Sequence, residues 1–141
     1  MTATPIVEVV PLRQKNDTAE VLLTRREDDD PNWPGMLHTP GTVVRASDAP
    51  GSYNDAFRRI LDTELKSVEL AGEPQFVETI LHDGNRGMED AKIYYVEVVG
   101  EPTEGTFYDA NNLPSDTVKS QIGFIQSAVS RFLSSRSDTL Q

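Results

Sequence analysis

Three positions of one helical segment, 60, 63 and 64, have the spacing at which side chains can share a divalent cation. Residues at i, i+3 and i+4 of a helix lie on one face. Carboxylates gathered there can hold Mg²⁺, which bridges phosphate oxygens, screens their charge and activates water. This face offers one carboxylate, Glu64, beside Ile60 and Thr63. One carboxylate on such a face could hold Mg²⁺ only together with waters or substrate phosphates.

The composition narrows the class of partner. The chain of 141 residues has a formal net charge of −10, with 13 Lys and Arg against 23 Asp and Glu. Such a balance disfavours nucleic acid, which needs a basic surface. It also repels a free polyphosphate unless the site supplies cations. We therefore expect a small-molecule ligand that binds together with a metal ion or arginines.

The sequence also indicates a location. No apolar run is long enough to span a bilayer, and the first residues lack the basic region of a signal peptide. The chain has no cysteine, which excludes disulfides and thiolate chemistry. We expect a cytoplasmic protein that does not bind membranes.

The elements that position the chemistry alternate between strands and helices. One domain is expected over residues 1–134, followed by a frayed polar tail at 135–141. β-Branched runs predict strands at 6–11, 20–25, 75–82 and 91–99, and an extended segment at 37–44.

Apolar spacing predicts a helix over 55–66 and a final helix that begins at Ser115 or Asp116. Residues 101–112 are predicted to be irregular. The order of these elements predicts an α/β fold, a mixed β-sheet with helices packed on its faces.

One motif resembles a known family. The stretch Trp33-Pro34-Gly35-Met36-Leu37-His38-Thr39-Pro40-Gly41-Thr42-Val43-Val44, followed by the helix that contains Ala56, Arg59 and Glu64, resembles the front half and the metal-binding helix of a Nudix domain. The Nudix signature reads Gly, five residues, Glu, seven residues, then Arg-Glu-Ψ-x-Glu-Glu-x-Gly-Ψ, where Ψ is aliphatic. The resemblance implies a Nudix-like α/β/α sandwich with a mixed β-sheet and the metal helix on one side.

The match to that signature is partial. Pro40-Gly41-Thr42 lies where the family has Pro-Gly-Gly, and Asp48 takes the place of the isolated glutamate. Arg59 and Glu64 match the helix motif, while Ile60 and Thr63 occupy glutamate positions. A second frame, one residue earlier, would instead pair Arg58 with the arginine and Asp62 with a glutamate.

The resemblance implies a set of site residues. With one carboxylate left on the metal-binding face of the helix, Mg²⁺ is expected to bind weakly, with Glu64 and Asp48 as its ligands, and tight binding of several ions is not expected. The expected catalytic residues are Glu64 and Arg59; the expected substrate-binding residues are Arg25, Arg26 and Gly41. Glycine at position 41 would allow close approach of a ligand to the backbone. An acid from the other side of the cleft, Glu89 or Asp90, would have to replace the base that position 60 lacks.

Two functions follow from this reading. The first is a divergent Nudix-type hydrolase of a nucleoside diphosphate-linked substrate, whose depleted metal site makes its activity weak or absent. The second is a non-catalytic Nudix-like domain that binds a nucleotide or a protein partner through the same cleft. The sequence is compatible with a homodimer and does not identify the substrate.

Overall fold

The computed structural model describes residues 3–30, 33–43, 54–65, 68–84 and 87–139. Neither helix in these ranges combines the length and the apolar composition that crossing a membrane requires. The elements, in chain order, are β1 (Thr4–Lys15), β2 (Thr18–Arg25), β3 (Leu37–His38), β4 (Gly41–Val43), α1 (Asn54–Thr63), β5 (Glu69–Leu70), β6 (Gln75–Gly84), β7 (Gly87–Val99), β8 (Thr106–Asp109) and α2 (Lys119–Thr139).

β1 organises the sheet, because it pairs with three other strands. It runs parallel to β7, with Glu8 opposite Ile93. Along its other edge it changes partner. The first half is antiparallel to β4, with Glu8 opposite Gly41, and the second half is antiparallel to β2, with Leu12 opposite Val21. The remaining described strands extend the sheet outward, β3 and β8 from β2, and β5 and β6 from β7.

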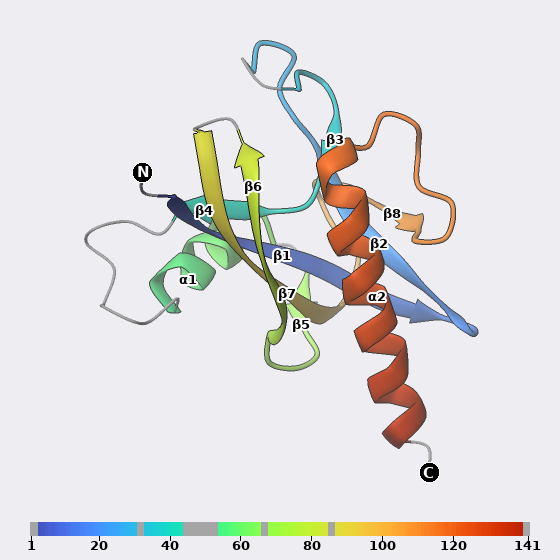
Figure 1. Cartoon of the computed structure of the whole chain (residues 1–141). Helices are drawn as coiled ribbons and strands as arrows, with labels where there is room; N and C mark the ends of the chain where they lie inside the picture. The colour runs from blue at the N-terminus through green and yellow to red at the C-terminus, as the bar shows by residue number, and fades with distance from the viewer. Residues whose placement is uncertain (1–2, 31–32, 44–53, 66–67, 85–86, 140–141) are drawn as a thin grey trace.

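A helix covers each face of this mixed sheet (Figure 1). Successive side chains of a strand point to opposite faces. Val7 and Val9 of β1 therefore pack in the same cluster as Ile60 of α1. Val10 of β1 lies in the other cluster, with Phe124 of α2. The predicted α/β/α sandwich is confirmed, as are the four predicted strands and the helix after residue 54.

Two short strands were not predicted. Residues 101–112 were expected to be irregular, yet they contain β8, which is antiparallel to β2 with Phe107 opposite Leu22. The preceding Gly105 and the following Asn111-Asn112 are turn residues, so the local sequence indicates a loop. Residues 106–109 are nevertheless extended, because they pair with β2. β5 pairs with β7 over only two residues.

Both ends of α2 differ from the prediction. A cap at Ser115 or Asp116 is wrong, because Ser115 and Asp116 lie in a turn, Thr117 forms a β-bridge with Leu37, and α2 begins at Lys119. The Leu37 N–H donates to the Asp116 carbonyl, and the Val118 N–H donates to the Leu37 carbonyl, each at 2.9 Å. At the other end α2 continues to Thr139, within the tail predicted to be frayed.

Candidate functional site

Glu64 follows α1 directly, and its side chain is largely buried. Its backbone N–H donates to the Ile60 carbonyl at 2.9 Å, so the last helical turn fixes where the side chain starts. The carboxylate accepts a hydrogen bond from the backbone N–H of Gly41 in β4. Its Oε2 atom is buried without a hydrogen-bond partner among the described residues. Burial, the main cause, raises the pKa of Glu64 to about 7, because desolvation disfavours the charged form.

The two helix positions that lack a glutamate have different environments. Ile60 is 2% exposed and packs with Val9 in the core beneath α1. Thr63 is exposed, and its Oγ1 donates to the Arg59 carbonyl at 2.7 Å. Position 60 thus contributes to packing, and position 63 to the end of the helix. Glu64 alone keeps a carboxylate directed into the site.

Burial also separates the two frames of the helix motif. Arg58 and Asp62, which the second frame would align with the signature, are exposed. Arg59 and Glu64 are half-buried, and Glu64 binds the Gly41 N–H of β4. The structure therefore supports the frame in which Arg59 and Glu64 match.

Glu8 is a site residue that the sequence prediction missed. It lies on β1 opposite Gly41, and its Oε2 accepts a hydrogen bond from Thr39 Oγ1 at 3.2 Å. Burial raises the pKa of Glu8 to about 8; Thr39 lowers it, and the charges of Glu89 and Glu64 raise it further. A signal was present in the sequence, because Glu8 is a lone acid within the apolar run Ile6 to Pro11.

Gly41 brings Glu8 and Glu64 together. Its N–H binds Glu64, and a Cβ added at this position would lie 2.5 Å from Glu8 Oε2. A side chain at position 41 would therefore have to displace the Glu8 carboxylate. Thr39, on the same segment, is held by its own N–H donating to Gln121 Oε1 of α2 at 2.9 Å. The segment that carries the Pro-Gly motif thus serves as the floor of a carboxylate cluster.

The two acids proposed to replace the missing base lie apart. Glu89 of β7 is 6% exposed, and its charge acts on Glu8. Asp90 points to the opposite face of the strand, where its Oδ1 lies 3.6 Å from Lys92 Nζ. Of these two residues, Glu89 is the one whose charge acts on Glu8. We call Glu8, Glu64 and Glu89 the carboxylate cluster.

The two arginines at the end of β2 also differ. The charge of Arg26 lowers the pKa of both Glu8 and Glu64, which places this guanidinium near both carboxylates. The Arg26 Nη2 atom lies 2.8 Å from Asp30 Oδ2. Arg25 is exposed and is bound away from the cluster. Its Nη1 donates to Asp116 Oδ2 at 2.7 Å and to the Gly35 carbonyl at 2.6 Å.

Two further residues from the sequence analysis complete this account. Asp48, expected as a metal ligand, lies outside the described residues. Burial lowers the pKa of His38 to about 4, with a smaller contribution from the charge of Arg26. His38 is therefore a neutral imidazole near pH 7, which can accept or donate a hydrogen bond but carries no charge.

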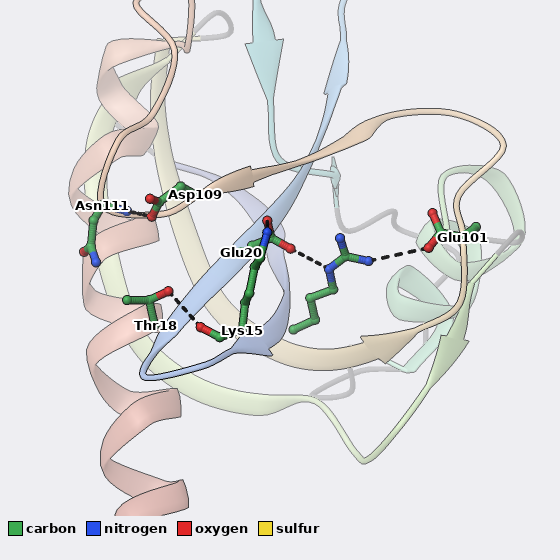
Figure 2. A network of polar contacts seen from close by, with 7 residues as sticks. Lys15, Thr18, Glu20, Glu101, Asp109 and Asn111 are labelled. Atoms are coloured by element: carbon green, nitrogen blue, oxygen red, sulfur yellow. Dashed lines mark hydrogen bonds and ion pairs between the residues drawn. The ribbon is translucent and has the colours of Figure 1, made fainter.

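A second group of charged side chains lies around the β1–β2 hairpin (Figure 2). Arg13 Nε lies 2.7 Å from Glu20 Oε1, and Lys15 Nζ lies 3.6 Å from Glu20 Oε2. Both oxygens of that carboxylate thus face cations. At Glu8, burial and the charges of Glu89 and Glu64 instead raise the pKa, and the charge of Arg26 lowers it.

Among the described residues, no group of three or more His, Cys, Asp and Glu side chains could hold a metal ion. A Mg²⁺ at Glu64 would therefore depend on one or two carboxylates together with waters or substrate phosphates. The buried Glu64 Oε2 lacks a partner, and neighbouring carboxylates would gain from a shared cation. Mg²⁺ takes hard oxygen ligands and keeps several waters or substrate phosphates. One or two of these carboxylates therefore suffice for it.

Comparison with solved structures assigns the fold. A mutT/nudix family protein from Listeria innocua is 15% identical, with a TM-score of 0.72 and 100% of both chains covered. The NUDIX domain of Shewanella oneidensis NrtR, complexed with ADP ribose, is 14% identical, with a TM-score of 0.68, 94% of this chain and 90% of that chain covered. The Ap4A hydrolase of C. elegans is 14% identical, with a TM-score of 0.65 and coverage of 94% and 99%.

Comparison of the sequence with family models and with curated proteins finds no relative. No protein-family model matches the chain. No curated protein matches it either. The similarity therefore lies in the three-dimensional arrangement, at identities where structure is retained and sequence is not. The chain has the Nudix fold.

Proposed function

We propose that this protein is a divalent-cation-dependent hydrolase of a small nucleoside diphosphate derivative. The observation that carries the proposal is the buried carboxylate of Glu64, bound to the Gly41 N–H on one side and left with an unpartnered oxygen on the other. Leaving such an oxygen buried costs free energy. A site that binds a cation together with its substrate gives that oxygen a ligand to hold.

Each residue of the site has its own proposed role. Glu64 would hold Mg²⁺, and Asp48 remains a proposed further ligand. Bound Mg²⁺ would screen the diphosphate oxygens and lower the pKa of a coordinated water. Arg26 supplies positive charge beside the carboxylates, which a chain of net charge −10 needs to admit a polyphosphate. Gly41 leaves the backbone open to close approach.

Two of the proposed roles concern other arginines. Arg59 would order the end of α1, where its carbonyl already accepts the Thr63 hydroxyl at 2.7 Å. Arg25 would contribute to substrate binding only by leaving its contacts with Asp116 and Gly35. We therefore rank Arg26 above Arg25 as a substrate-binding residue.

The substrate class rests on what similar proteins are named for. One neighbour is complexed with ADP ribose and another is an Ap4A hydrolase, so both point to nucleotides whose phosphates link two groups. We carry this class to the present chain as a proposal. A cytoplasmic location and a homodimer stay predictions from the sequence.

A panel of nucleoside diphosphate derivatives with Mg²⁺ or Mn²⁺, followed by phosphate release, tests the activity. Glu64→Gln should reduce turnover by about 10²–10⁴, the range typical for loss of a positioned acid or base. Asp62→Asn is the matched control, because Asp62 is exposed on α1 and points away from the site. Equal turnover in Glu64→Gln and the wild type would refute the role of Glu64.

A non-catalytic binding domain is the second candidate. Ile60 and Thr63 favour it, because each stands where a hydrolase of this fold has a helix glutamate. A ligand that stabilises the protein against heating equally well in EDTA, without turnover, would support the binding domain. Stabilisation that requires the divalent cation would support the hydrolase.

A further inference from the structure

We propose that Gln121 of α2 is a positioning residue for Glu64, on which it acts from the other side of the sheet through the backbone of Thr39-Pro40-Gly41. α2 and α1 cover opposite faces of the sheet (Figure 1), and Glu64 directly follows α1. The inference rests on the proposed function and deepens it, because it names a residue that controls where the hydrogen-bond donor to Glu64 lies. Gln121 is not a catalytic residue, since it acts through Gly41.

The first observation concerns the residues that join β3 to β4. β3 pairs with β2, and β4 pairs with β1, so the chain changes partner over Thr39 and Pro40, which lie outside both strands. Thr39 is 0% exposed, and a buried backbone N–H needs an acceptor. The Oε1 atom of Gln121 accepts from this N–H at 2.9 Å. A side chain of α2 therefore takes the place of a strand partner at this junction.

The second observation is that the next peptide unit, Pro40–Gly41, is bound at both of its polar atoms. The Pro40 carbonyl accepts from the Val9 N–H at 2.9 Å, and the Gly41 N–H donates to the Glu64 carboxylate. A peptide unit is planar, and proline has a fixed φ. The direction of the Gly41 N–H therefore depends on where the preceding residue, Thr39, is held, and Gln121 holds it.

The third observation is that Gln121 is itself fixed. It is 8% exposed and lies in the first turn of α2. Its backbone N–H donates to the Val118 carbonyl at 3.0 Å, and the Val118 N–H donates to the Leu37 carbonyl at 2.9 Å. Leu37 lies two residues before Thr39, so the start of α2 binds this segment both through the backbone and through a side chain. The position of α2 is thus transmitted to Gly41.

Three variants of α2 separate the acceptor oxygen of Gln121 from its bulk. Gln121→Met keeps a side chain of similar length but has only a weak sulfur acceptor. Gln121→Glu keeps an oxygen acceptor at the same place along the side chain. Gln126→Met removes a glutamine from an exposed position of the same helix and is the matched control.

The NMR signal of the Gly41 amide, recorded on the full chain at one pH without metal or substrate, gives the first readout. An amide chemical shift reports the geometry of the folded state, so a general loss of stability does not move it. In Gln121→Met the Gly41 amide proton should move upfield, because its hydrogen bond to the Glu64 carboxylate lengthens, while the signal of Ile93 in the core stays in place. Gln121→Glu and Gln126→Met should leave the Gly41 signal where the wild type has it.

Turnover of the nucleoside diphosphate derivatives with Mg²⁺ or Mn²⁺ gives the second readout. Gln121→Met should lower kcat by about 10-fold, the lower end of the usual effect of altering a partner that orients a metal ligand, and Gln121→Glu should restore it. In a Glu64→Gln background the same substitution should have almost no further effect, because Gln121 acts through Glu64. An equal loss in both backgrounds would show a general structural role and overturn the inference.

The two readouts distinguish failure of the inference from failure of the proposed function. A wild type that turns over no member of the panel, together with a moved Gly41 signal in Gln121→Met, overturns the proposed function and leaves the link between Gln121 and Gly41 standing. Wild-type turnover that Gln121→Met leaves unchanged overturns the inference and leaves the proposed function standing. A Gly41 signal that does not move in Gln121→Met overturns the inference whatever the turnover.

Discussion

The metal-free protein should lose stability as the pH rises from mildly acidic to mildly basic. The pKa of Glu8 is raised from 4.5 to about 8, chiefly by burial, with Glu89 and Glu64 adding to the rise and Thr39 and Arg26 opposing it. The pKa of Glu64 is raised from 4.5 to about 7. Both shifts have the same sign, so their effects on stability add.

The sign follows from proton binding. Below pH 4.5 the two carboxyls are protonated in the folded and the unfolded chain alike. Between pH 4.5 and about 8 the unfolded chain releases a proton that folded Glu8 retains, so the free energy of unfolding falls with rising pH. Above that range Glu8 is ionised in both states and its contribution is constant. The stability that depends on these protons is therefore present in acid and lost toward pH 8.

The magnitude is large for a domain of this size. Each pH unit between the two pKa values is worth about 1.4 kcal/mol. The interval of about 3.5 units for Glu8 corresponds to an upper limit of ~5 kcal/mol. Domains are typically stable by only about 5–15 kcal/mol, so the metal-free protein should be measurably less stable at basic pH than in mild acid.

Urea unfolding in EDTA, followed by circular dichroism from about pH 5 to about pH 9, measures this dependence. The wild type should show a falling midpoint with an unchanged slope m. Glu8→Gln should flatten the curve, leaving the smaller fall from Glu64. Wild-type stability that rises or stays level across this range, or a Glu8→Gln curve parallel to that of the wild type, would refute the reasoning.

Three further outcomes are expected, each measurable by urea unfolding. Gly41→Ala should cost about 1–3 kcal/mol through the clash with Glu8, and much less in a Glu8→Ala background; additive costs would contradict the contact. Ile60→Glu should destabilise the protein by ~3–5 kcal/mol near neutral pH, because it leaves an uncompensated charge in the core, and wild-type stability would show that position 60 can turn outward. Arg25→Ala should leave the urea midpoint almost unchanged, because its pair with Asp116 is exposed; a clear loss of stability would show that this pair anchors the start of α2.

The sequence predicted the regular elements because each carries a local pattern. The apolar spacing of residues 55–66 predicted a helix, and α1 extends over Asn54–Thr63. The β-branched runs at 6–11 and 20–25 lie within β1 and β2. The apolar periodicity of each element shows which of its sides is buried, and this periodicity can be read from the residues of that element alone.

Elements that depend on a distant partner were missed. β8 has four residues flanked by residues typical of turns, and it forms a strand because it pairs with β2. The start of α2 is set by Leu37, which pairs with residues 116–118 from far along the chain. The two partners of such a contact lie far apart along the chain, so a local sequence pattern cannot reveal it.

The site divides in the same way. The sequence alone indicated Glu64 and Gly41 as candidates, because the helix motif and the Pro-Gly motif are contiguous, and it has no carboxylate at positions 60 and 63. Only the tertiary structure showed that the charges of Glu89 and Glu64 act on Glu8, that Asp90 lies beside Lys92, and that the charge of Arg26 acts on Glu8 and Glu64 while Arg25 binds Asp116. A carboxylate from a strand becomes a neighbour of a helix only when the sheet registers align, and register is fixed by pairing across the whole sheet.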